Sequence, residues 1–134
     1  MQKLVLDTNA LLRSLPKTSR HHDLWKSLFD GRNQLCVSNE ILTEYEEILT
    51  QRIPPILAQE IINQILRNPF TVLITKYYHF NLITSDPDDN KFVDCAVCAE
   101  AKFIVTEDRH FQILKEIDFP KVDIITLDEI IALI

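Results

Sequence analysis

The stretch LVLDTNALL, residues 4–12, opens on an apolar run, continues through three short polar residues and returns to leucine. This pattern predicts a buried β-strand over residues 2–6, followed by a helix that begins near Thr8 and ends before Pro16. A carboxylate at the end of a buried strand costs free energy unless a hydrogen bond or a cation compensates it. Asp7 is therefore the first candidate for a functional residue in this sequence.

The same alternation of strand and helix continues along the rest of the chain. Further strands are predicted over residues 34–38, 70–75, 103–106 and 122–127, with a weaker candidate over 80–84. Helices are predicted over residues 22–31, from Ser38 or Asn39 to about 49, over 56–66, 89–101 and 109–117, and at 128–134. Such alternation predicts a three-layer α/β/α fold, with a central parallel sheet that helices cover on both faces.

Composition sets the broad class of the protein. At 134 residues, 46% of them apolar and 25% charged, the chain suits a single domain over residues 1–134. No apolar stretch approaches the roughly 18 residues of a membrane span, and the first residues lack a secretory signal. The three cysteines, which have apolar neighbours, are expected to be reduced thiols. We therefore expect a cytoplasmic protein without a membrane partner.

The net charge of −6 argues against an overall electrostatic attraction to nucleic acid. It leaves room for a local basic strip, and it suits a site that gathers carboxylates around a metal ion. Arg13, Lys17 and Arg20, together with Lys26, follow the first strand and are candidate contacts for RNA phosphates. A solvated helix face explains these basic residues about as well.

Three of the predicted strands run directly into polar residues. Asp7 follows the first strand, Ser38 the second, and the run Thr106-Glu107-Asp108 follows the strand FIV. Functional groups of open parallel sheets collect beyond the carboxyl ends of the strands. Each of these residues alone could simply cap the helix that follows it. Their joint placement favours a shared site over independent caps.

The predicted helix over 89–101 allows a choice between two acids. At 100° per residue its apolar face consists of Phe92, Val93, Ala96, Val97 and Ala99. Asp89 falls at the centre of that face, at its N-terminal end, whereas Asp94 lies off the face and towards solvent. A buried acid requires a hydrogen-bond donor or a cation. Asp89 is therefore the preferred site residue, and Asp94 is the second choice.

Other acidic and histidine residues are less decisive. Glu44 and Glu46 flank the apolar stripe of their helix at similar angles, so spacing does not choose between them. The four histidines show no metal-ligand spacing, and we expect them at the surface or at the rim of a site.

The segments LVLDTN, SNEILTEYEEIL and DPDDNKFVDCAVCAEAKFIVTEDRHF together resemble PIN domains. They are most similar to the bacterial and archaeal branch of toxins related to VapC, and the resemblance spans nearly the whole chain. It implies an α/β/α sandwich with a parallel sheet and metal-dependent ribonuclease activity. It also implies an RNA substrate, a cognate antitoxin and a homodimer.

Position by position, the resemblance implies four catalytic and metal-binding acids, which are Asp7, Glu44, Asp89 and Asp108. Asn9 and Thr106 match supporting polar positions, to which we add Ser38 from its place at a strand end. The interval from Ala96 to Thr106 is one residue longer than the usual toxin spacing. This leaves Asp94 or Asp88 as alternatives to Asp89, and Glu107 as a neighbour competing with Asp108.

The chemistry explains why such a site collects carboxylates. A phosphodiester is an anion and repels a hydroxide nucleophile; one or two Mg²⁺ or Mn²⁺ ions offset that charge, and both prefer oxygen ligands. We therefore expect the four acids to converge at the carboxyl edge of the sheet.

Two other functions fit parts of the sequence. One is a Mg-dependent phosphoryl hydrolase of the haloacid-dehalogenase type, although those enzymes carry D-x-D at the first strand, where this chain has Asn9 as the second residue. The other is a catalytically inactive PIN-fold protein that binds nucleic acid or a protein partner. The presence of all four acids argues against the loss of activity.

Overall fold

The computed structural model describes residues 1–75 and 79–134, and it contains a five-stranded sheet in the order β3-β2-β1-β4-β5. All four pairs of neighbouring strands are parallel. The strands are β1 (Gln2–Leu6), β2 (Asn33–Ser38), β3 (Val72–Ile74), β4 (Phe103–Val105) and β5 (Ile124–Ile125). The strand that opens the sequence therefore lies at the centre of the sheet, as its apolar composition requires.

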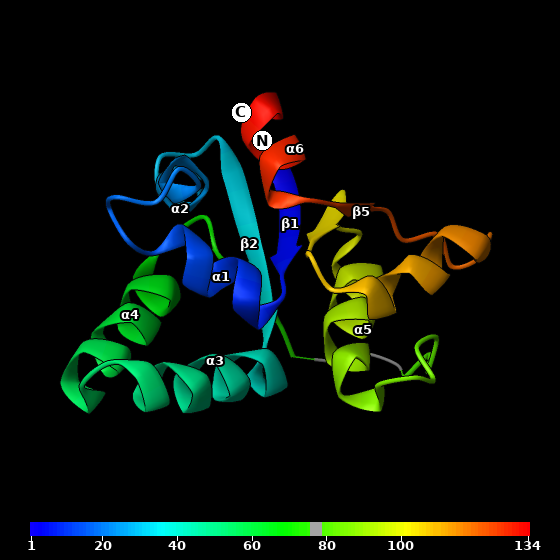
Figure 1. The fold of residues 1–134 in the computed structure, drawn as a ribbon, viewed down its shortest axis with the longest axis horizontal. Coiled ribbons are helices and arrows are strands. Elements are labelled where there is room, and N and C mark those ends of the chain that lie inside the picture. The colour runs from blue at the N-terminus through cyan, green and yellow to red at the C-terminus, as the bar shows by residue number, and fades with distance from the viewer. Residues whose placement is uncertain (76–78) are drawn as a thin grey trace.

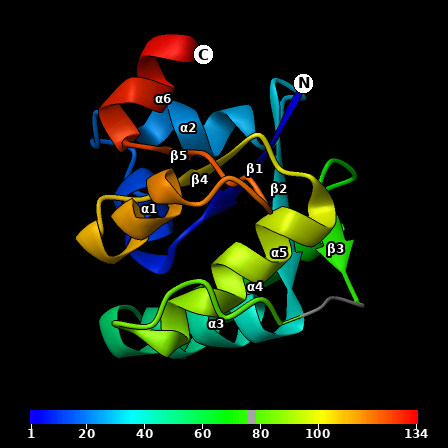
Figure 2. The same ribbon diagram turned by 90° about the vertical axis from the view of Figure 1, so that its right-hand side faces the viewer.

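Helices cover both faces of this sheet. They are α1 (Thr8–Ser14), α2 (His22–Ser27), α3 (Asn39–Arg52), α4 (Pro55–Arg67), α5 (Asn90–Ala99) and α6 (Leu127–Leu133), with 3-10 helices η1 (Pro87–Asp89) and η2 (Arg109–Glu116). Figure 1 shows β1 and β2 between α1, α2 and α4 on one side and α5 on the other. In both views α3 runs along the edge where β2 ends (Figures 1 and 2). The predicted three-layer α/β architecture is confirmed.

The central strand carries the core of the protein. Leu4, Val5 and Leu6 are all 0% exposed, because β1 is covered on both faces and paired on both edges. The ladder continues one residue beyond the strand, where the Asp7 amide donates to the carbonyl of Val105 at 3.2 Å. The backbone of Asp7 is thereby fixed at the carboxyl edge of the sheet.

Some predicted elements differ from those observed. The helix expected over 22–31 ends at Ser27, and the one expected over 109–117 is the 3-10 helix η2. The weaker candidate at 80–84 is not a strand; instead Ile83 exchanges two backbone hydrogen bonds with the Asn90 side chain, both at 2.8 Å. A side-chain amide thus replaces the neighbouring strand that this segment lacks. None of the helices in residues 1–75 and 79–134 is long and apolar enough to cross a membrane.

A buried hydrogen bond ties α3 to the central strand. The hydroxyl of Tyr45, 0% exposed, donates to the carbonyl of Leu6 at 2.6 Å. Burial raises the pKa of Tyr45 well above its usual value, so the hydroxyl remains protonated and available as a donor. This bond holds the first half of α3 against the end of β1, next to Asp7.

Removing that hydroxyl is expected to destabilise the fold. Tyr45→Phe leaves the Leu6 carbonyl without this buried donor, which should lower the free energy of unfolding by about 1–3 kcal/mol. Urea denaturation followed by circular dichroism measures the change. Thr43→Val is the matched control, since it removes an exposed hydroxyl on the same helix and should change stability by less than about 0.5 kcal/mol. Equal stability of Tyr45→Phe and the parent protein would contradict the structural role of the bond.

Candidate functional site

The four predicted acids line one cleft at the carboxyl edge of the sheet. Asp7 follows β1, Glu44 lies on α3, Asp89 precedes α5, and Asp108 follows β4. The cleft has a volume of about 260 Å³ and is lined by Asp7, Thr8, Asn9, Glu44, Ile48, Gln51, Arg52, Asp89, Phe92 and Asp108. Residues up to 101 positions apart in the chain therefore meet in one place, as expected from parallel strands.

Asp7 is the most enclosed of the four acids, with 6% of its surface exposed. Its Oδ1 accepts a hydrogen bond from the amide of Ala10 at 2.8 Å, and its Oδ2 accepts one from the hydroxyl of Thr106. Asp7 therefore does cap α1, as the alternative interpretation of the sequence held. Burial raises the pKa of Asp7, and the two hydrogen bonds offset part of that effect. Because a carboxylate can accept about four hydrogen bonds, capacity remains for a cation.

The two neighbouring acids that follow β4, Glu107 and Asp108, point to different places. The hydroxyl of Thr106 accepts the Asp108 amide at 3.0 Å, and the Asp108 carboxylate accepts the amide of His110 at 2.9 Å. Glu107 instead accepts the amide of Leu127 at 3.2 Å, at the start of α6. Of the two acids, only Asp108 lines the cleft. Thr106 thus hydrogen-bonds both the Asp7 carboxylate and the turn that presents Asp108.

The ambiguity between Glu44 and Glu46 is also resolved. Glu44 lines the cleft, whereas Glu46 is exposed. The Glu44 carboxylate accepts a hydrogen bond from the hydroxyl of Thr8 and another from the ammonium of Lys91 at 2.7 Å. Lys91 is only 13% exposed in its side chain, and sequence reasoning missed it. No local pattern marks Lys91, because only the packing of α5 beside α3 brings it to Glu44.

Asp89 differs from the other three acids because no described residue donates a hydrogen bond to its Oδ2 atom. This oxygen atom is buried. Burial raises the pKa of Asp89 to about 6, and the nearby carboxylates of Asp86 and Asp108 act in the same direction. An acid that ionises at neutral pH in such surroundings requires a compensating cation.

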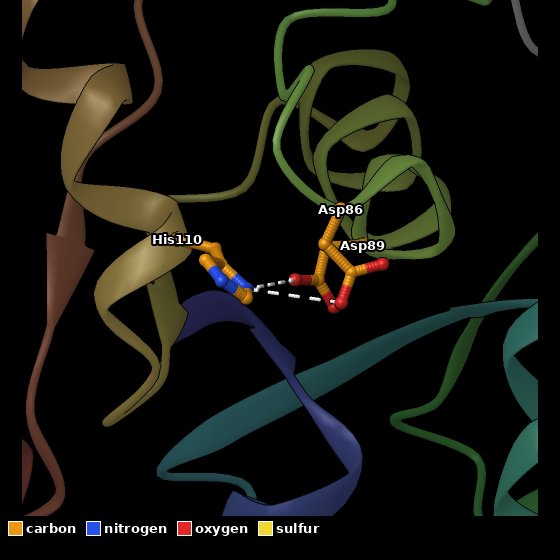
Figure 3. A group of neighbouring side chains, drawn as sticks. All are labelled: Asp86, Asp89 and His110. Carbon is orange, nitrogen blue, oxygen red and sulfur yellow. Dashed lines mark ion pairs between the residues drawn. The ribbon is translucent and has the colours of Figure 1, made fainter.

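Two residues that the sequence did not single out extend this side of the cleft. Side-chain ligand atoms of Asp86, Asp89 and His110 lie within 4.8 Å of one another. Figure 3 shows the ring of His110, which comes from η2, pointing at the two carboxylates at the start of α5. The side chain of His110 is half-buried beside Asp89 and Asp108, and its Nδ1 atom is buried. The pair Asp86-x-x-Asp89, with a histidine two residues after Asp108, is the sequence signal that could have indicated the group.

The expected solvent exposure of Asp94 was wrong. Asp94 is 2% exposed; its carboxylate accepts the Phe80 amide at 3.0 Å and lies 3.4 Å from Nδ1 of His79. It does not line the cleft that holds Asp7. Helical periodicity predicted exposure because it contains no information about residues 79–83, which contact this side of α5.

Of the two predicted supporting residues Asn9 and Ser38, only Asn9 lines the cleft. Asn9 is exposed and lines the cleft, as expected of a polar neighbour of Asp7. Ser38 is 1% exposed, and its hydroxyl accepts the amide of Ile41 at 3.3 Å, so it caps α3. Ser38 therefore positions the helix that carries Glu44 and does not itself line the cleft.

The predicted basic strip does not line the cleft either. Arg13, Lys17 and Arg20 are all exposed, and Arg20 pairs with Asp128 of α6 at 3.3 Å. Lys17 lines a separate hollow beside α2, together with Trp25. Among the described residues, the basic side chain that lines the cleft is that of Arg52 at the end of α3, which the sequence had not indicated.

Comparison with known proteins gives the family. The sequence pattern of the PIN domain matches residues 3–110, a range that contains all four acids. The chain belongs to the PIN domain family. Among curated proteins, none matches the sequence of this PIN domain significantly.

Solved structures share the fold of this PIN domain. The crystal structure of VapBC2 from Rickettsia felis, bound to a DNA fragment from its promoter, matches with a TM-score of 0.64 at 16% identity. The match covers 92% of this chain and 98% of that one. The PIN domain endonuclease Utp24 matches with a TM-score of 0.52 at 16% identity, covering 92% of this chain and 84% of that one. The sequence resemblance and the predicted fold are both confirmed.

The pKa of Asp89 predicts an unusual dependence of stability on pH in metal-free protein. Because the folded chain raises this pKa from 3.8 to about 6, folding favours the protonated acid. The resulting stabilisation is full below the unfolded pKa and is lost as the pH rises through about 6. Asp89→Asn, which is neutral at every pH, should therefore be more stable than the parent protein at pH 8, by a margin that shrinks below pH 6.

Urea denaturation of both proteins in buffer with a metal chelator, between pH 4 and 8, measures this margin. Asp88→Asn is the matched control, since Asp88 is exposed one residue earlier and does not line the cleft. A margin for Asp89→Asn that stays constant across the range would contradict the cause given for the shift.

Proposed function

We propose that this PIN domain is a metal-dependent endoribonuclease that hydrolyses RNA phosphodiester bonds in the cytoplasm. Its catalytic and metal-binding residues would be Asp7, Glu44, Asp89 and Asp108. The observation that carries the proposal is the convergence of these four carboxylates, from four separate elements, in one cleft. Membership of the PIN domain family and the fold shared with the endonuclease Utp24 support a nuclease.

The residues of the cleft fit a divalent cation. The buried Oδ2 atom of Asp89 has no hydrogen-bond partner in residues 1–75 and 79–134, and the four carboxylates offer the oxygen ligands that Mg²⁺ and Mn²⁺ prefer. Asp7, Glu44, Asp89 and Asp108 would hold one or two such ions. When bound, a divalent ion activates water and offsets the charge on the phosphate and the leaving oxygen.

The remaining residues orient the acids and supply positive charge. Thr106 and the Ala10 amide hold the carboxylate of Asp7, while Thr8 and Lys91 hold that of Glu44. The ammonium of Lys91, and the Arg52 guanidinium at the cleft, offer contacts for the RNA backbone. Arg13, Lys17 and Arg20 would contact phosphates of the RNA that lie further from the bond to be hydrolysed.

Substitutions that remove one carboxylate charge test the proposal. Asp7→Asn and Glu44→Gln should each lower Mn²⁺- or Mg²⁺-dependent RNA cleavage by about a hundredfold or more, because each removes a metal ligand. Asn caps a helix nearly as well as Asp, so a pure capping role for Asp7 predicts unchanged activity.

Cleavage of a fluorescent RNA, measured together with thermal unfolding of each variant, distinguishes these roles. Glu46→Gln is the matched control on α3, since Glu46 is exposed and away from the cleft. Cleavage at the parental rate by Asp7→Asn would end the metal-nuclease proposal. A parent protein that cleaves no RNA with either ion would favour the inactive PIN-fold interaction protein.

We also propose that the chain acts as the toxin of a toxin–antitoxin pair. The fold shared with VapBC2 over 98% of that chain supports this role. A small protein encoded by the neighbouring gene, co-purifying with the chain and blocking RNA cleavage, would be the expected antitoxin. Failure of every neighbouring gene product to bind the chain would contradict the toxin role while leaving the nuclease proposal intact.

Exposed apolar side chains suggest a homodimer of this single domain. Ile56 on α4 is 83% exposed and Leu66 is 51% exposed, while Leu133 on α6 is 62% exposed. We predict a dimer by light scattering at micromolar concentration. Ile56→Glu or Leu133→Glu should convert it to a monomer, according to which helix forms the interface. A parent protein that is purely monomeric would reject the prediction.

A further inference from the structure

An imidazole nitrogen lies among three carboxylates at one end of the cleft. Nδ1 of His110 is 3.3 Å from Asp108 Oδ1, 3.5 Å from Asp89 Oδ2 and 3.7 Å from Asp86 Oδ2. The three carboxylates come from two places in the chain, the 3-10 helix η1 before α5 and the end of β4. Asp89 and Asp108 also line the main cleft, so His110 and Asp86 extend that site rather than form a separate one.

This arrangement leaves its central atoms without hydrogen bonds. Both His110 Nδ1 and Asp89 Oδ2 are buried and have no hydrogen-bond partner among the described residues. A protonated imidazole serving only as a counter-ion would be expected to bond a carboxylate at about 2.7–2.9 Å. The distances of 3.5 Å to Asp89 and 3.7 Å to Asp86 are longer. They are close to the separation of two ligand atoms of one ion, which is roughly 3–3.6 Å when each atom is about 2.0–2.2 Å from the metal.

We propose that His110, with Asp86 and Asp89, gives the metal site a nitrogen ligand that makes it favour a first-row transition ion over Mg²⁺. The inference rests on the proposed metal-dependent function and specifies the metal class. His110 would ligate through Nδ1 as the neutral tautomer, with its proton on Nε2. Mg²⁺ requires near-ideal octahedral geometry and prefers oxygen ligands, whereas imidazole favours transition ions.

The two carboxylate oxygens of Asp86 have different partners. Its Oδ1 accepts the amide of Asp88 at 3.3 Å and caps η1, which leaves Oδ2 directed at His110. An asparagine at this position would keep the cap while removing the charge. Asp86→Asn therefore tests the ligand role of Oδ2 with little effect on the turn.

Electron spin echo spectroscopy of the Mn²⁺-loaded full chain provides a readout that does not depend on activity. We expect ¹⁴N modulation from a directly bound imidazole in the parent protein and its loss in His110→Gln. Titration calorimetry should show the Kd for Mn²⁺ rising at least tenfold in His110→Gln and in Asp86→Asn. The Kd for Mg²⁺ should change less than threefold in His110→Gln, whereas it should rise in Asp86→Asn, which removes an oxygen ligand. His79→Gln, which alters a histidine beside the buried carboxylate of Asp94, should leave both Kd values and the modulation unchanged.

The outcomes separate this inference from the proposed function. RNA cleavage that depends on Asp7 and on metal, with no ¹⁴N modulation in the parent protein, would overturn the role of His110 and keep the nuclease. Modulation that His110→Gln abolishes, in a protein that cleaves no RNA, would support the ligand set and reject the nuclease. Equal losses of Mg²⁺ and Mn²⁺ affinity in His110→Gln would overturn the proposed selectivity.

Discussion

The burial of the Asp7 carboxylate at the end of the central strand is the constraint on which the rest of the structure depends. β1 is paired on both edges and covered on both faces, so its carboxyl end opens only towards the edge of the sheet. A carboxylate there requires donors, and the structure supplies them from the Ala10 amide and the Thr106 hydroxyl. The start of α1 and the end of β4 are thereby set relative to each other.

The other acids are held by contacts that follow from this arrangement. α3 is tied to β1 through Tyr45, which places Glu44 beside Thr8. α5 packs against the opposite face of the sheet and brings Lys91 to Glu44. A protein with a net charge of −6 can concentrate carboxylates in this way because the local cations offset part of their repulsion. The ion pair between Lys91 and Glu44 therefore links α5 to α3.

The geometry of the cleft also bears on the two alternative functions, the inactive PIN fold and the phosphoryl hydrolase. A protein that had lost its metal would gain stability by replacing Asp89 with a neutral residue, because the buried oxygen of Asp89 has no donor in the described part of the chain. The burial of this oxygen without a donor among the described residues fits a cation-binding role better than a purely interacting PIN fold. Asn9, in place of a second aspartate after the first strand, leaves the phosphoryl-hydrolase alternative without its expected residue, although Asn9 does line the cleft.

Local patterns in the sequence determined the alternation of strands and helices, and with it the acids at strand ends, because periodicity and capping depend on neighbouring residues. Asp7 and Asp108 both follow strands and both cap the helices after them. Residue spacing left Glu44 and Glu46 equivalent, and it placed Asp94 in solvent. The family resemblance selected Glu44, but only the tertiary structure showed that Asp94 is buried and that His110 lies beside Asp86 and Asp89. Contacts between residues tens of positions apart depend on how helices pack across the sheet, which periodicity along the chain does not encode.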